Sequence, residues 1–226
     1  VSGEGGVAWV LEKLLRPWQY VCTVSLAMQV HRQNLYACPV PKLVDHDVRR
    51  REIAQAVWAV IAERGIEGVT LRSVAAEAGV SVGRIQHYHA SREELVRDSC
   101  RELLKAATQR FEAAGDATPV ERLRRLILGR IPTTPEFAIG TSIWLAYEAK
   151  SVDDPVIAEL VQRGHAGGVQ EAAALLSECG VADASSVALR LMATAEGLAI
   201  RVLVGGLEPR AATELLEDLI TEALPG

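Results

Sequence analysis

Aromatic side chains, paired cysteines and long apolar runs are all scarce in this 226-residue sequence. Aromatic residues make up only 4% of it, whereas β-strands are enriched in them, so the abundant Ala, Val and Leu favour packed helices over a β-sandwich. The four cysteines form no CxxC pair, which excludes a disulfide scaffold and a zinc ribbon. No apolar run reaches the roughly 20 residues that a membrane-spanning helix needs.

Positive charge is also scarce for a protein that would coat nucleic acid. The formal net charge is −5, and residues 98–226 hold twelve basic against nineteen acidic side chains. Any attraction to phosphate must therefore come from local basic positions nearer the start of the chain. The content of 49% hydrophobic and 23% charged residues is typical of a folded protein and excludes wholesale disorder.

Residues 1–44 differ in character from the rest, with Trp9, Trp18, Pro39 and Pro41 among them. We interpret this segment as an extension with little fixed structure. The alternative is an arm that packs on the next domain or on DNA. No basic start precedes its short apolar part, so a signal peptide is not predicted, and we expect a cytoplasmic protein.

From residue 45 onward the pattern predicts helices throughout, and no convincing strand alternation is present. Side chains that can cap a helix, or a proline in the first turn, precede most apolar stretches. The predicted starts are Thr70, Ser81, Ser91, Thr118-Pro119, Thr134-Pro135, Asp154-Pro155, Asp183 and Pro209. The fold is therefore predicted to be all-α, with an extension at 1–44, a first domain at 45–92 and a second helical domain at 93–226.

The segment from residue 70 to 95, TLRSVAAEAGVSVGRIQHYHASREEL, has the spacing of a helix-turn-helix. Such a unit needs a small residue where its two helices cross, here Ala75, and a residue that tolerates positive φ in the turn, here Gly79. Apolar positions must also fix the two helices at one angle, and these are Val74, Ala78, Val80, Ile85 and Tyr88. The second helix of this unit can then enter the major groove of DNA.

With these residues in place, the chain resembles the TetR family of transcriptional repressors. The resemblance rests on Gly65, Thr70, Val74-Ala75, Ala78-Gly79-Val80-Ser81, Gly83 and Ser91-Arg92-Glu93-Glu94-Leu95. The ending, with Gly197-Leu198, Leu203, Gly205-Gly206-Leu207 and Pro209, is similar to the BetI-like branch of that family. Three positions depart from the usual pattern, because His89 replaces a phenylalanine, Gln86 a tyrosine and Arg92 a lysine.

The chemistry of the second motif helix suggests how it reads DNA. Gln86 suits the donor and acceptor of adenine, and Arg84 suits guanine or a phosphate. The resemblance implies that His87, Tyr88 and Arg92 contact phosphates. The predicted DNA-binding residues are Arg49, Arg50, Arg51, Thr70, Arg72, Ser81, Val82, Gly83, Arg84, Gln86, His87, Tyr88 and Arg92. Two alternatives stay open: Tyr88 as a core residue, and Arg49–Arg51 as a solvated helix start.

Two apolar stripes near the C-terminus predict a homodimer, because one short recognition helix buries too little surface for tight binding. The first stripe comprises Leu189, Met192, Ala193, Gly197, Ile200 and Val204, and the second Leu215, Leu216, Leu219 and Ile220. The alternative is that part of each stripe faces the core of its own chain.

The resemblance also implies that the middle helices enclose a small-molecule ligand. The candidate contacts are Phe111, Phe137, Trp144, Tyr147, Glu148, His165 and Met192. Aromatic rings with an acid suit a cationic ligand. The alternative places Trp144 and Tyr147 in the core and leaves Glu148 solvated beside Lys150.

These features predict a ligand-responsive transcriptional regulator, a repressor that binds a palindromic DNA operator as a dimer and is released by a small-molecule inducer. No cofactor or metal site is predicted. No GxSxG, HExxH or phosphate-loop motif is present, so an enzyme is not predicted. The alternative is a helical ligand-binding or scaffold protein whose DNA-reading domain has degenerated.

Overall fold

The structure, a computed structural model, describes residues 43–112 and 117–225. Every regular element in these ranges is a helix, and none is a strand, so the all-α prediction is confirmed. The predicted extension at 1–44 lies outside the described residues except for its last two positions. Within the described ranges, each helix is too short or too polar to pass through a lipid bilayer.

The contacts divide the chain into two units, the first ending at Glu102 and the second beginning at Leu103. This division falls inside the helix α5 (Arg92–Glu112), not at its start, where the sequence placed the domain boundary. The reason is that Leu95, Val96 and Cys100, in the first half of α5, are all buried. This half of the helix therefore belongs to the core of the first unit.

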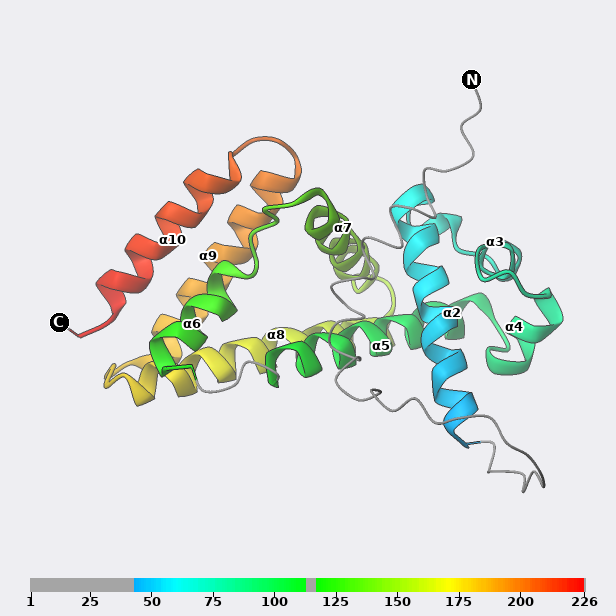
Figure 1. Cartoon of the computed structure of the whole chain (residues 1–226), viewed down its shortest axis with the longest axis horizontal. Helices are drawn as coiled ribbons and strands as arrows, with labels where there is room; N and C mark the ends of the chain where they lie inside the picture. The colour runs from blue at the N-terminus through cyan, green and yellow to red at the C-terminus, as the bar shows by residue number, and fades with distance from the viewer. Residues whose placement is uncertain (1–42, 113–116, 226) are drawn as a thin grey trace, which may run out of the picture. The chain divides into compact units, whose positions relative to one another are not determined.

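The first unit contains the long helix α2 (Leu43–Arg64), the short 3-10 turn η1 (Ile66–Gly68), and the helices α3 (Leu71–Glu77) and α4 (Val82–Tyr88) (Figure 1). Gly65 ends α2 with a φ of 71°, a conformation that glycine adopts without steric cost. The 3-10 turn was not predicted from the sequence.

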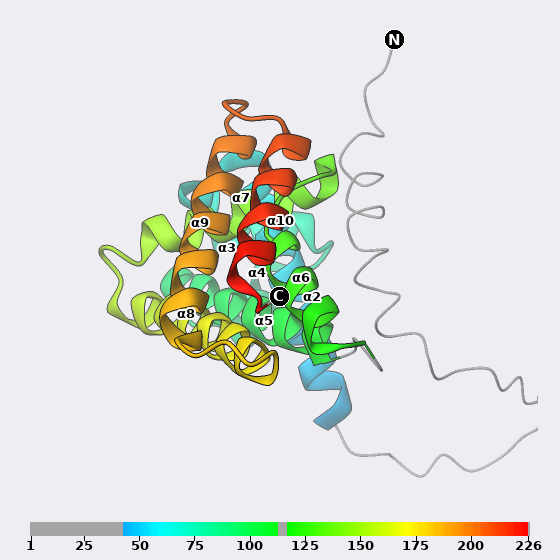
Figure 2. The same cartoon turned by 90° about the vertical axis from the view of Figure 1, so that its left-hand side faces the viewer.

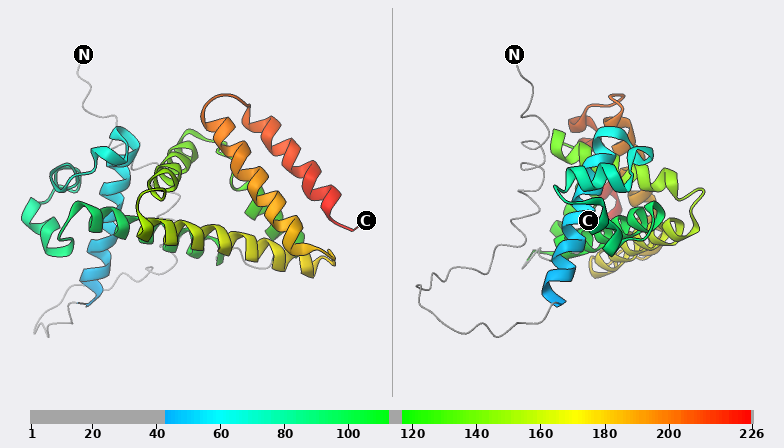
Figure 3. Two further views of the ribbon diagram at one scale, coloured as in Figure 1. Left: turned by 180° about the vertical axis from the view of Figure 1, so that it is seen from behind. Right: turned by 90° about the vertical axis from the view of Figure 1, so that its right-hand side faces the viewer.

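The second unit contains α6 (Pro119–Leu128), α7 (Pro135–Lys150), α8 (Pro155–Glu178), α9 (Ala184–Leu203) and α10 (Pro209–Ala223). The side chains of Thr118, Thr134 and Asp154 accept hydrogen bonds from backbone N–H groups in the first turns of α6, α7 and α8, as predicted. The helices α9 and α10 pack side by side (Figure 2), and α8 packs along α9 and α6 (Figure 3).

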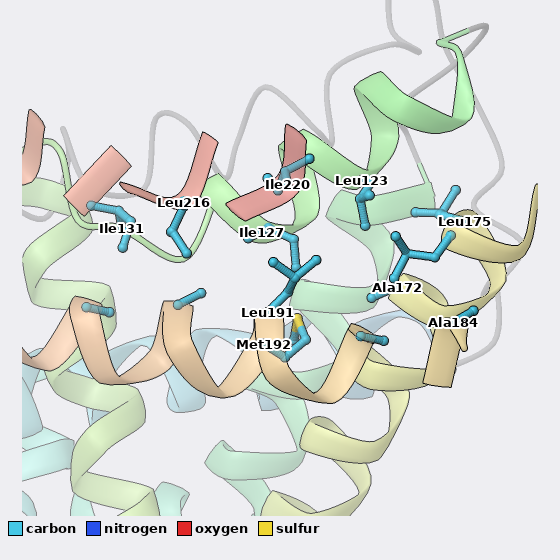
Figure 4. Close-up of a cluster of buried hydrophobic side chains, with 14 of the residues drawn as sticks. Leu123, Ile127, Ile131, Ala172, Leu175, Ala184, Leu191, Met192, Leu216 and Ile220 are labelled. Carbon is cyan, nitrogen blue, oxygen red and sulfur yellow. The ribbon is translucent and has the colours of Figure 1, made fainter. Parts of the chain in front are cut away.

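One hydrophobic cluster holds α6, α8, α9 and α10 together. Leu123 and Ile127 from α6, Leu191 from α9, and Leu216 and Ile220 from α10 meet there and are almost fully buried (Figure 4). Burying a leucine or isoleucine side chain of this kind contributes about 1.5–3 kcal/mol. The inward position of Leu216 and Ile220 shows that these members of the second predicted stripe face their own core.

Candidate DNA-binding surface and ligand site

The turn between α3 and α4 has the geometry that the sequence predicted. Gly79 has a φ of 63°, and the backbone N–H of Val80 donates to the carbonyl of Ala75 at 3.0 Å. Ala75 and Val74 are buried under the crossing of the two helices. The helix-turn-helix is therefore fixed by one left-handed glycine and a close contact between small side chains.

The short helix α4 has a buried side that packs against its own unit and an exposed side, which we call its free side. Ser81 caps its start by accepting from the N–H of Arg84 at 3.2 Å, and Ile85 anchors it with no exposed surface. Arg84, Gln86 and His87 are exposed, and so is Gly83. Donors and acceptors on this free side are available to the base edges of a major groove.

The other residues predicted to contact DNA lie around this helix. Thr70 caps α3 by accepting from the N–H of Ser73 at 3.0 Å, and Arg72 in the first turn of α3 is exposed. Tyr88 is half-buried, with its ring 4.7 Å from that of His46 and 5.2 Å from that of His87. The side chain of Tyr88 therefore packs against its neighbours and remains partly accessible to solvent.

The three consecutive arginines near the start of α2 differ among themselves. Arg50 and Arg51 are exposed, whereas Arg49 pairs with Glu52 at 2.6 Å. Val82 is half-buried at the first position of α4. Arg50 and Arg51 are therefore the members of this basic group that are exposed to a partner, although the Nε of Arg51 donates to the carbonyl of Asp47 at 3.4 Å.

Arg92 is engaged within its own unit. Its Nε donates to the carbonyl of Val69 at 2.8 Å, and its second guanidinium nitrogen donates to the carbonyl of Ile66 and the carboxylate of Glu67, both at 2.9 Å. These bonds join the start of α5 to the turn before α3. The guanidinium thus ties the start of α5 to the segment before the helix-turn-helix, a structural role that the sequence did not suggest.

His89 replaces the expected phenylalanine and is buried directly after α4, with 2% of its surface exposed. Its Nδ1 lies 3.3 Å from a carboxylate oxygen of Asp98, but neither ring nitrogen makes a well-aligned hydrogen bond among the described residues. Burial lowers the pKa of His89, against the opposing pull of Asp98 and Glu94, and Arg50 lowers it further. The neutral imidazole is therefore the form that fits this place.

In the second unit, three of the predicted ligand residues come together. His165 on α8 lies with its Nε2 3.1 Å from Glu148 on α7, and its ring lies 5.8 Å from that of Trp144. Two residues that the sequence reasoning missed complete the group. Glu196 on α9 lies 3.2 Å from the Nδ1 of His165, and Arg130 lies 3.5 Å from the same carboxylate. We call these five residues the polar cluster.

The polar cluster is partly open to solvent, since its charged side chains keep between 24% and 35% of their surface exposed. Burial raises the pKa of Glu148, although His165, the indole N–H of Trp144 and Arg130 oppose this effect. Burial likewise lowers the pKa of Arg130, opposed by Glu196 and Glu148. The indole nitrogen of Trp144 is buried and makes no hydrogen bond of ordinary geometry within the described residues.

Two glycines of α8 allow the cluster to form. A Cβ atom on Gly164 would lie 2.8 Å from Leu104 and 3.2 Å from the ring of Trp144. A Cβ atom on Gly168 would lie 2.7 Å from both Arg130 and Met192. The bare backbone of α8 therefore brings Trp144 and Arg130 close to the helix that carries His165.

The remaining predicted ligand residues do not gather at one site. Tyr147 and Met192 are buried, and Met192 belongs to the hydrophobic cluster. Phe137 is half-buried, and the side chain of Phe111 lies outside the described residues. Glu196 had a signal in the sequence, since it is the single acidic residue in the largely apolar α9. Arg130 had no such signal in the sequence, because only the folded structure brings it close to Glu196.

Comparison with known proteins identifies the family. Residues 53–98 match the bacterial regulatory proteins of the tetR family, and residues 119–225 match the C-terminal part of BetI-type transcriptional repressors. The chain is 32% identical over 171 residues to the HTH-type transcriptional regulator PksA of Bacillus subtilis (strain 168), over 73% of this chain and 83% of PksA. The chain belongs to the TetR family of transcriptional regulators.

Other TetR-family relatives extend the match. The HTH-type transcriptional regulator BetI of Burkholderia mallei (strain NCTC 10229) is 31% identical over 194 residues, which cover 82% of this chain and 98% of BetI. A crystal structure of a putative transcriptional regulator from Saccharomonospora viridis in complex with choline is 29% identical, with a TM-score of 0.71 over 79% of this chain and 98% of that one. The resemblance drawn from the helix-turn-helix and from the C-terminal motifs is thus confirmed.

The TetR-family chain also exposes much of the first predicted dimer stripe. Leu189 and Ile200 on α9 and Val204 directly after α9 are exposed by 58%, 41% and 72%, and Leu215 on α10 by 46%. Ala193 and Gly197 lie between them at exposed positions, whereas Met192 is buried. Leu189, Ala193, Gly197 and Ile200 recur at helical spacing on α9, and Leu215 is exposed on α10, which packs against α9; we call these exposed residues, with Val204, the α9–α10 face.

Proposed function

We propose that this TetR-family regulator represses transcription by binding a palindromic operator as a homodimer, and that an organic cation releases it. The observation that carries the proposal is the free side of α4, where Arg84, Gln86 and His87 stand exposed on a helix anchored by Ile85. Such a helix can place its polar side chains against base edges while its buried side keeps them in position.

A second copy of the chain is the partner that the α9–α10 face fits. Leu189, Ile200, Val204 and Leu215 expose apolar surface on neighbouring helices, and a contiguous apolar face of this kind marks an interaction site. A two-fold pair of α9–α10 units makes an isologous four-helix interface. Two recognition helices then read two half-sites, which explains the palindromic operator.

The polar cluster is the site proposed for the inducer. Trp144 supplies an aromatic ring and Glu148 and Glu196 supply carboxylates, a combination that favours a quaternary or protonated amine. The similarity to a regulator solved in complex with choline supports this class of ligand. Because α7, α8, α9 and the segment after α6 all contribute to the cluster, a ligand there contacts α9, one of the two helices that carry the α9–α10 face.

Release follows from a shift between two conformations of the dimer. In one conformation of the dimer the spacing of the recognition helices matches successive major grooves, and in the other it does not. If the cation binds the second conformation more tightly, it lowers the affinity for the operator by the difference between its binding free energies for the two conformations. Coupling of this kind typically amounts to about 1–3 kcal/mol, or about 5- to 150-fold in affinity.

Selection of bound fragments from genomic DNA tests the proposal. We expect an inverted repeat among the selected fragments, a protein of twice the 24.4 kDa chain mass in light scattering, and weaker operator binding when choline is added. Fragments without any shared repeat would contradict operator reading and would favour a helical ligand-binding protein with a degenerate DNA-reading domain.

Substitutions on α4 then assign the base contacts. We expect Arg84→Ala and Gln86→Ala each to weaken operator binding by about 1–3 kcal/mol, roughly 5- to 150-fold, while binding to random DNA changes little. Arg210→Ala on α10 removes the same kind of exposed side chain and serves as the matched control. Gel-shift titrations at one salt concentration provide the measurement, and equal losses on operator and random DNA would contradict base reading.

A further inference from the structure

Both ring nitrogens of His165 face carboxylate oxygens. The Nε2 atom lies 3.1 Å from Oε1 of Glu148, and the Nδ1 atom lies 3.2 Å from Oε1 of Glu196. A neutral imidazole carries a hydrogen on only one of its nitrogens. The other nitrogen would direct its lone pair at a negatively charged oxygen, which is repulsive at this distance. One more proton, shared among Glu148, His165 and Glu196, would remove this repulsion.

The extra proton also balances the charges of the polar cluster. Glu148 on α7 and Glu196 on α9 contribute two negative charges, and Arg130, before α7, contributes one positive charge. The shared proton brings the sum to zero, and without it the cluster carries one unit of negative charge. The raised pKa of Glu148, which is caused by burial, agrees with a carboxyl group that holds protons readily in this place.

We propose that the polar cluster exchanges this shared proton for the organic cation, so that each cation bound releases one proton to solvent. The inference rests on the proposed function, because it takes the cation as the ligand of the cluster. The exchange is balanced: the cluster with its proton and the free cation become the cluster with its cation and a free proton. No covalent bond other than the one to this proton changes.

Electrostatics makes the two positive charges compete. With both the proton and the cation present, the half-buried cluster would carry a net positive charge, and an uncompensated charge costs more in a half-buried place than in water. With the cation alone, Glu148 and Glu196 balance Arg130 and the ligand, and the indole ring of Trp144 offers its face to the cation. The carboxylate that no longer accepts a hydrogen from His165 then pairs with the cation instead, so the imidazole needs a hydrogen on one nitrogen only.

The exchange makes the affinity for the cation depend on pH. Where the cluster holds its proton, removing that proton must accompany binding, so the affinity rises as the pH rises. The limit is about tenfold per pH unit, which corresponds to one proton per ligand. Above the range in which the proton is held, the affinity becomes constant.

Calorimetry of the full-length protein with choline and with tetramethylammonium tests the exchange. Titrations between pH 6.5 and pH 8 in phosphate and in the zwitterionic buffer MOPS, whose ionisation enthalpies differ, give the number of protons released per ligand. We expect a release approaching one proton at the acid end of this range, and an affinity that increases by up to about tenfold per pH unit. Binding without proton release and without pH dependence would overturn the exchange but leave the cation as ligand.

Two variants make the test specific to His165. We expect His165→Gln, which keeps a hydrogen-bonding side chain but no imidazole, to bind the cation with a weaker pH dependence and a smaller proton release. His46→Gln removes an exposed histidine in the other unit and should bind the cation like the unaltered protein. An unchanged release in His165→Gln would overturn the shared role of this imidazole. If neither cation binds the unaltered protein, the exchange and the proposed ligand class both fail.

Discussion

The two units of the chain place their polar side chains in opposite ways. In the first unit, α4 buries Ile85 and exposes Arg84 and Gln86, so chemistry and packing occupy different sides of one helix. In the second unit, Glu148, His165 and Glu196 meet half-buried between three helices, where chemistry and packing share the same space. The polar residues on the exposed side of α4 can therefore be replaced without disturbing the fold, whereas those of the polar cluster affect folding and binding together.

The largest effect is expected for Ile85, which anchors α4, and it tests whether the buried and exposed sides of this helix have separate roles. We expect Ile85→Ala to lower the free energy of unfolding by about 2–5 kcal/mol, because the side chain has no exposed surface and its removal leaves a cavity. Gln86→Ala, on the exposed side of the same helix, should leave stability within about 0.5 kcal/mol. Urea unfolding followed by circular dichroism gives both values, and equal stabilities would show that α4 is not packed as described.

Arg92 tests whether a charged residue of the first unit serves the fold or the DNA. Because its guanidinium bonds Val69, Ile66 and Glu67, we expect Arg92→Gln and Arg92→Lys both to lower stability by about 1–3 kcal/mol. The dependence of DNA binding on salt concentration should stay the same in both variants. If Arg92 instead contacts a phosphate, Arg92→Gln reduces the salt slope by about one and Arg92→Lys restores it.

His89 gives the smallest expected effect, and its sign follows from burial. Its pKa is lowered in the folded protein, so the unfolded chain binds the proton more readily. The stability that the neutral imidazole provides is therefore complete above the unfolded value of 6.5 and is lost as the pH falls below it.

The matched variant is His89→Phe, which cannot titrate. Between pH 7 and pH 5 we expect the unaltered protein to lose up to about 1.4 kcal/mol per pH unit relative to this variant. Thermal unfolding across this pH range measures the difference, with His87→Phe, at an exposed position of α4, as the control. Parallel pH profiles for His89→Phe and the unaltered protein would show that Asp98 and Glu94 compensate the burial.

The helix-turn-helix could be predicted from the sequence because its determinants are local. Gly79 makes the turn four positions after the small residue at Ala75, and Thr70 and Ser81 cap helices that begin with the next residue. Each of these requirements concerns backbone groups only a few residues away. What the sequence could not supply was the bonding of Arg92, which joins residues more than twenty positions apart.

The polar cluster was predictable only in part, for the same reason. Trp144 and Glu148 are four residues apart on one helix, so a shared face could be expected from helical spacing. His165, Glu196 and Arg130 come from three other parts of the chain, and their meeting depends on how α8 packs against α7 and α9. For a related reason, the sequence could not tell which residues of the two apolar stripes face the core and which face solvent. Spacing alone does not distinguish Leu215, which is exposed, from Leu216, which is buried.

One glycine of α8 limits how the polar cluster can be redesigned. A methyl group added at Gly164 would lie 2.8 Å from Leu104 and 3.2 Å from the rigid ring of Trp144. At Gly168 the nearest atoms are the ends of two flexible side chains, Arg130 and Met192, which can move aside. Libraries aimed at a biosensor with altered selectivity should therefore keep Gly164 and diversify Trp144 and Glu148 on α7.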